Sequence, residues 1–102
     1  MDNDLFHVGR SLRVPRLGLL VLPTPPAPAW LLGPALHTAL AVALHHPPHP
    51  TRSLLASIEE LEQAGQPPTR ALLLATDPGG PVAAGAWLAP LDLNPDDLLS
   101  LV

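Results

Sequence analysis

Fifteen prolines are spread through this chain of 102 residues, and they limit what it can fold into. Proline cannot donate a hydrogen bond to a sheet, and inside a helix it clashes with the preceding turn. Long regular elements are therefore excluded almost everywhere. We expect a single domain over residues 1–102, built from short elements that are joined by stiff turns.

The stretch Leu36–Pro50, LHTALAVALHHPPHP, decides the fold class. Its leucines recur every four residues with alanines between them, which permits a helix. The larger residues Leu40, Val42 and Leu44 also alternate with alanines, as they would in a half-buried strand. Prolines on both sides leave room for only about three helical turns. We interpret the stretch as a central strand, and an α/β fold with a helix near 30–45 is the alternative.

The other segments also favour an all-β fold. The first expected strand contains Gly9, which indicates a bulge, and it is expected to lie at an edge. A helix extended to Glu62 is an alternative for the fourth segment, with Gly65 just past its end. The expected strands besides the central stretch are Asp4–Val14, Arg16–Leu22, Arg52–Glu60, Arg70–Thr76 and Val82–Leu88, and a short terminal turn is expected over 94–102.

The charge balance argues against nucleic acid as a partner. Nine acidic and five basic residues, all of the latter arginine, give a net charge of -4, whereas nucleic-acid binding depends on neutralising phosphates. Charged residues make up only 14% of the chain, and hydrophobic residues 47%. A surface so poor in charge is expected to be covered by a protein partner or by a second copy of the chain. There is no cysteine, which excludes disulfides, thiolate metal sites and thiol nucleophiles.

No membrane span is expected. Residues 17–51 contain no Asp, Glu, Lys or Arg, but the longest piece without tightly spaced prolines, Ala29–Leu44, is shorter than the roughly 20 apolar residues that a span requires. The first ten residues are acidic and lack the basic start of a signal peptide. We therefore expect a cytoplasmic protein.

Histidines are the candidate metal ligands. His45, His46 and His49 lie in the HHPPHP segment, and His37 is a possible fourth ligand, because neutral imidazole binds zinc and copper. His45 and His46 are adjacent, however, and point to opposite faces of a continuing strand. We interpret the segment as a rigid polar loop and keep metal binding as the alternative.

Three of the five arginines, Arg10, Arg13 and Arg16, cluster near the start of the chain and are the candidate interaction residues. At strand spacing Arg10 and Arg16 share one face, and Arg13 takes the other. The simpler interpretation is that these charges keep a strand soluble.

No catalytic constellation is present. Ser53 and Ser57 lie near His49 in sequence and Asp77 could orient a base, but no fixed spacing supports a triad. The glutamates at 59, 60 and 62 are interpreted as a solvated face rather than as paired acid and base. We expect no enzyme activity and no cofactor.

Three motifs resemble the β-barrel domain that follows the GTPase domain in elongation factor Tu and its relatives. DLFHVGR is similar to the opening "D-x-F-x-V-x-G-R" of that domain, IEELEQAGQPPTRALLL to its later part, and GAWLAP to its closing "G-x-x-L-A-x-P". The matching residues are Asp4, Phe6, Val8, Gly9, Arg10, Ala64, Gly65, Gly85, Leu88 and Ala89. The chain departs from the pattern by one residue fewer between Val8 and Gly9 and by Gln66-Pro67 after the second glycine.

The resemblance implies a small antiparallel β-barrel of about six strands that stands alone. No GxxxxGK[ST] motif is present, so no GTPase function comes with it. In translation factors this barrel is a contact module for the ribosome, tRNA or neighbouring domains. Because the charge balance opposes RNA, the expected function is a non-catalytic interaction module that binds a protein partner or self-associates. A small metal-binding protein that uses His45, His46 and His49 is the alternative.

Overall fold

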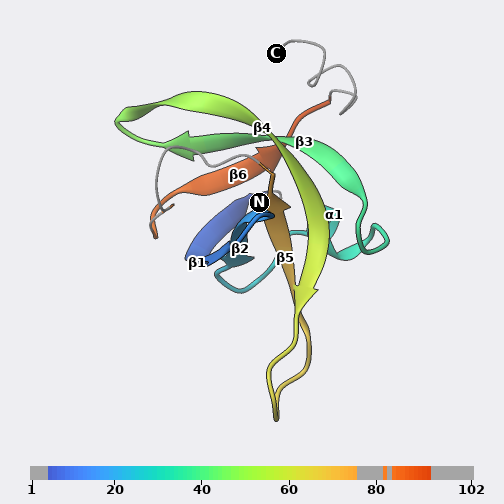
Figure 1. Cartoon of the computed structure of the whole chain (residues 1–102). Helices are drawn as coiled ribbons and strands as arrows, with labels where there is room; N and C mark the ends of the chain where they lie inside the picture. The colour runs from blue at the N-terminus through green and yellow to red at the C-terminus, as the bar shows by residue number, and fades with distance from the viewer. Residues whose placement is uncertain (1–4, 76–81, 83, 93–102) are drawn as a thin grey trace.

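The computed structural model describes residues 5–75, 82 and 84–92. Within these residues the chain forms strands and one short helix (Figure 1). The elements in chain order are β1 (Phe6–Val14), β2 (Gly18–Pro23), α1 (Ala29–Leu32), β3 (Ala39–His46), β4 (His49–Leu61), β5 (Thr69–Leu74) and β6 (Trp87–Pro90).

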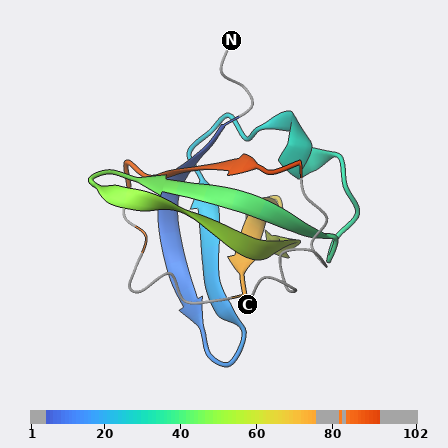
Figure 2. The ribbon, with the colours of Figure 1, turned by 90° about the horizontal axis from the view of Figure 1, so that it is seen from above.

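The six strands form one closed antiparallel barrel in the order β1-β2-β5-β4-β3-β6. The barrel closes where Phe6 and His7 of β1 pair with Leu88 and Trp87 of β6. Seen from above, β3, β4 and β6 cross over β1, β2 and β5, so the barrel consists of two groups of three strands (Figure 2). The expected all-β barrel of about six strands is confirmed. The alternative of a helix over 30–45 is wrong, because the helix has four residues and ends at Leu32.

Side chains that alternate along every strand fill the barrel interior, as is usual for a barrel of this size. The interior residues are Phe6, Val8, Leu19, Val21, Val42, Leu44, Leu54, Ala56, Ile58, Leu72, Leu74 and Leu88, joined by Leu31, Val82 and Ala86. Leu31 belongs to α1, which lies at the end of the barrel away from the β1–β2 turn (Figure 2). Each fully buried side chain of this size contributes about 1.5–3 kcal/mol relative to an exposed one.

The stretch Leu36–Pro50 contains a strand, as predicted, but the strand begins later than expected. β3 starts at Ala39, whereas His37 has a φ of 72° and lies in a turn. The Thr38 hydroxyl donates to the Ala35 carbonyl at 2.7 Å, which stabilises this turn. Val42 and Leu44 lie in the interior, so the period-two pattern identifies the correct face.

The bulge predicted at Gly9 is confirmed, because the pairing of β1 with β2 shifts register between Val8 and Arg10. A side chain at Gly9 would approach the Thr24 hydroxyl to 3.1 Å, so glycine suits the crowded position. The expectation that this strand lies at an edge is wrong. β1 pairs with β2 on one side and with β6 on the other, since the barrel is closed.

The segment 52–60 is a strand and not the alternative helix. β4 is the longest of the described strands, and it pairs first with β3 and then with β5. The strand expected over Val82–Leu88 is wrong in its bounds, because β6 begins at Trp87 and Gly85 has a φ of 102°. The terminal turn expected over 94–102 lies outside the described residues. In the part of the chain that the structure covers, no helix is long and apolar enough to cross a membrane.

Candidate interaction surface

A second apolar cluster lies on the outside of the barrel. Leu20 and Leu22 of β2 and Ala71 of β5 are buried in it, and Val14, Leu61 and Leu73 pack against them; we call these six residues the outer cluster. Leu20 lies directly opposite Leu73, and opposing residues in antiparallel strands point to the same face.

The origin of the outer cluster is visible in the sequence of β2. Its four consecutive residues Leu19–Leu22 are all apolar and buried, so the strand is apolar on both faces. Leu19 and Val21 point into the barrel, so Leu20 and Leu22 must point outward. The outward residues of a soluble barrel strand are usually polar, and this face departs from that rule.

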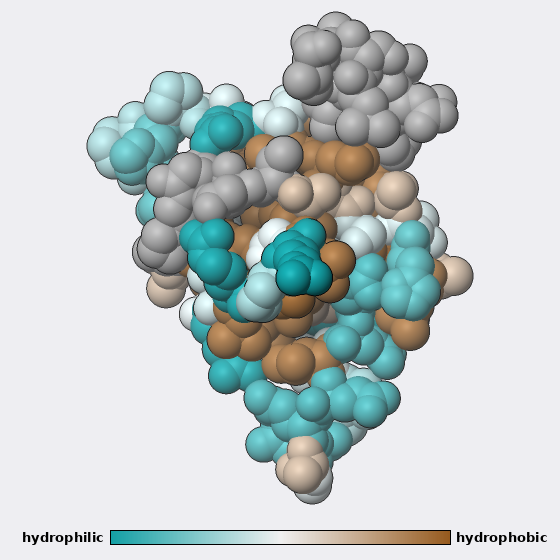
Figure 3. Space-filling model, in the orientation of Figure 1, coloured by the Kyte–Doolittle hydropathy of each residue, from teal (hydrophilic) through white to brown (hydrophobic). Residues whose placement is uncertain are grey.

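Two exposed leucines extend the apolar surface toward the β1–β2 turn. Leu12 lies opposite Leu20 and is 40% exposed, and Leu17 in the turn is 58% exposed. Figure 3 views the molecule with this turn toward the reader, and it shows hydrophobic and hydrophilic residues side by side over β1 and β2. Both leucines lie within or beside a hairpin that can be reached from solution.

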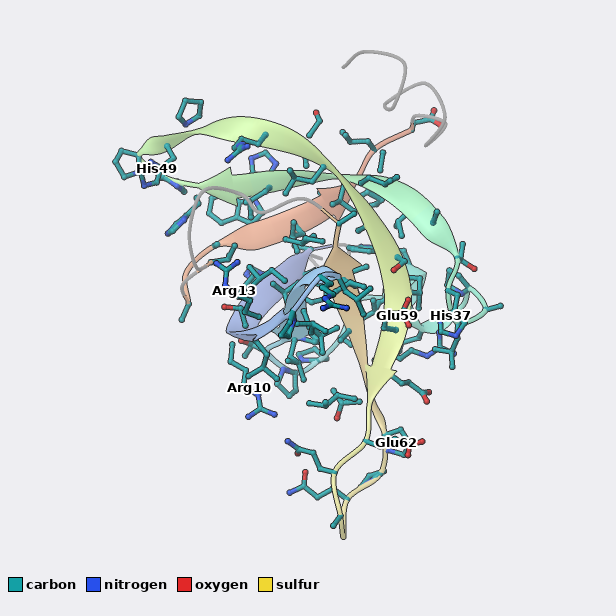
Figure 4. The ribbon with its side chains drawn as sticks, in the orientation of Figure 1. Arg10, Arg13, His37, His49, Glu59 and Glu62 are labelled. Carbon is teal, nitrogen blue, oxygen red and sulfur yellow. The ribbon has the colours of Figure 1, made fainter. Side chains whose placement is uncertain are left out.

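The three candidate arginines are exposed but do not form one patch. Arg10 lies opposite Leu22 and therefore beside the outer cluster, whereas Arg13 lies opposite the interior residue Leu19. Figure 4 shows Arg10 and Arg13 on opposite sides of β1, as the strand spacing predicted. The expectation that Arg16 shares the face of Arg10 is wrong, because Arg16 lies in the turn with a φ of 70°.

A glutamate flanks the outer cluster on the side opposite Arg10. Glu59 of β4 lies directly opposite Ala71, so the outer surface runs from Arg10 through Leu22 and Ala71 to Glu59. In Figure 4 Arg10 and Glu59 lie on either side of β2 and β5. The apolar surface is thus flanked by a positive charge at one edge and a negative charge at the other.

The glutamates are engaged with neighbouring side chains. A Glu59 oxygen lies 2.8 Å from Nδ1 of His37, and Glu60 pairs with Arg70 at 3.6 Å. Glu60 and Glu62 are exposed and Glu59 is half-buried, so the interpretation of residues 59, 60 and 62 as a solvated face is not contradicted. Within the described ranges no carboxylate lies within salt-bridge distance of Arg10, so its charge is available to a partner.

The four candidate metal ligands lie in three different places. His45 stacks on Trp87 of β6, with ring centroids 5.3 Å apart and an interplanar angle of 9°. His46 and His49 contact each other instead. His37 lies at the far end of β3, beside Glu59. Among the residues that the structure describes, no three histidine, aspartate or glutamate side chains come together to hold a metal ion.

The residues considered for catalysis are not assembled into a triad. The Ser57 hydroxyl donates to Glu59 at 2.9 Å, Ser53 is exposed on β4, and Asp77 lies outside the described residues. Sequence reasoning did not find the His37–Glu59 and Arg70–Glu60 pairs or the outer cluster. The uninterrupted apolar run of β2 is the signal in the sequence that indicates an apolar outer face as well as an apolar inner one.

Comparison of the chain with models of known protein families, with curated proteins and with solved structures finds no match in any of the three. The resemblance to the translation-factor barrel therefore stays a prediction.

Proposed function

We propose that the protein is a non-catalytic interaction module that binds another protein chain through the outer face of β1, β2 and β5. The outer cluster is the observation that carries this proposal, because it places leucines on the solvent side of a closed barrel. Leu12 and Leu17 add exposed apolar side chains next to the buried residues of the outer cluster. Leu20, Leu22 and Ala71 are themselves buried, so the exposed part of this apolar face is formed by Leu12 and Leu17. Exposed apolar side chains grouped on one face are typical of interaction sites.

The resemblance to the barrel domain of translation factors supports the same class of function. In those proteins the barrel contacts other macromolecules and carries out no chemistry. The net charge of -4 favours a protein over RNA as the molecule that is contacted here.

The occupant that best fits the outer face is a second copy of the chain. A two-fold axis through the middle of the outer cluster would bring Arg10 of one copy to Glu59 of the other, and the reverse, while the leucines pack between them. The surface is therefore complementary to itself in both charge and hydrophobicity.

Sedimentation velocity over a range of protein concentrations tests the proposal. We expect the wild-type chain to dimerise. Arg10→Glu and Glu59→Arg should each raise the dissociation constant of the dimer by about tenfold or more, and the double variant should recover part of the lost affinity. Arg70→Glu serves as the matched control, because Arg70 lies on β5 but pairs with Glu60 and the Pro34 carbonyl. A wild-type chain that stays monomeric up to high concentration would contradict self-association. A different protein that binds the wild type and loses binding on Leu12→Glu would then be the occupant of the same face.

A further inference from the structure

The β3–β4 hairpin brings two histidines together away from the outer cluster. His46 and His49 are paired residues of the two strands, and only Pro47 and Pro48 lie between them. The hairpin projects from the barrel, and His49 lies at its tip (Figure 4). The site is therefore accessible to a small ion without any movement of the barrel.

The separation of the two rings suits a shared metal ion. Their centroids lie 5.3 Å apart, and the ring planes are inclined at 55°. Two imidazoles that bind one tetrahedral metal at the usual zinc–nitrogen distance of about 2.0–2.1 Å have centroids roughly 5 Å apart. The observed centroid separation is close to that spacing.

Both imidazoles are available for binding. Within the described part of the chain neither ring makes a hydrogen bond, whereas Nδ1 of the neighbouring His45 lies 3.2 Å from the Thr51 hydroxyl. The prolines between and after the two histidines restrict the backbone, so less conformational freedom is lost on binding. Arg52 is the nearest arginine on β4. It pairs with Leu44, and this pair lies farther from the β3–β4 turn than the His46–His49 pair.

We propose that His46 and His49 form a two-imidazole site for a zinc ion, with water in the remaining coordination positions. Imidazole is a preferred zinc ligand, and the neutral rings would each supply one nitrogen. The proposal does not depend on the proposed function, because the histidines lie at the β3–β4 turn, at the opposite end of β4 from the outer-cluster residue Leu61.

Isothermal titration of the untagged chain with zinc chloride tests the site. We expect one zinc ion to bind per hairpin, and both His46→Ala and His49→Ala to abolish binding. His45→Ala is the matched control and should retain it, because that ring stacks on Trp87. Circular dichroism of each variant checks that the barrel is still folded. Absence of zinc binding by the wild type, or equal binding by the wild type and both His46 and His49 variants, would overturn the proposal.

Discussion

At the scale of single residues, positions where the backbones crowd are decisive. Gly18 opens β2 with a φ of 131°, and a side chain there would overlap the carbonyl oxygen of Leu74 in β5. Glycine is required for two reasons: other residues rarely adopt this φ, and there is no space for a Cβ atom beside the Leu74 carbonyl. Composition did not identify this position, since the overlap involves a strand more than fifty residues away. The bulge at Gly9 was predictable because it depends on the local pattern of β1.

Gly18→Ala is expected to destabilise the barrel by about 2 kcal/mol or more, from backbone strain and from displacement of β5. Urea unfolding followed by circular dichroism measures the change. Gly33→Ala is the matched control, because Gly33 has a φ of -77° and the nearest contact of an added carbon is 3.8 Å. Equal stability of the Gly18 variant and the wild type would contradict the close approach of β2 and β5.

At the scale of elements, alternation predicted the interior face of the strands better than their ends. Leu54, Ala56 and Ile58 were expected on one face of the segment 52–60, and all three lie in the interior of the barrel. The start of β3 was missed, because the turn at His37 depends on pairing with Ile58 of β4. Such pairing joins residues distant in sequence, and no local pattern encodes it.

Ile58→Ala is expected to cost about 2–5 kcal/mol of unfolding free energy, because Ile58 is fully buried in the barrel and the variant leaves a cavity. Leu17→Ala should change the stability by less than about 0.5 kcal/mol, since Leu17 is exposed in the turn. Thermal unfolding of both variants is compared at low protein concentration, where the proposed dimer would not contribute. A large loss of unfolding free energy in Leu17→Ala would mean that Leu17 stabilises the fold rather than contacting a partner.

At the scale of the whole molecule, the barrel presents separate surfaces on separate hairpins. The outer cluster and Arg10 lie on the side of β1, β2 and β5, and the histidine pair lies on the β3–β4 hairpin (Figure 4). The sequence indicated Arg10 and the histidines but not the outer cluster, and it could not show that Arg10 and Glu59 flank the same apolar surface. That arrangement follows from the strand order, which places β5 between β2 and β4.

Leu12→Glu is expected to weaken self-association by about tenfold or more without lowering the stability of the monomer. The substitution places a charge at the rim of the outer cluster, on a side chain that is already 40% exposed. Light scattering after size-exclusion chromatography reports the mass of the variant. His7→Glu is the control, because His7 is an exposed residue of the same strand that lies opposite Trp87 and away from the cluster.

The location of the interaction surface is tested most directly by amide chemical shifts in an NMR dilution series. Self-association through the outer face predicts concentration-dependent shifts in residues 10–22, 59 and 71–73, which surround the outer cluster, and constant shifts in residues 45–49 and 87–90. Shifts confined to the β3–β4 hairpin and β6, or no concentration dependence at any residue, would contradict the account.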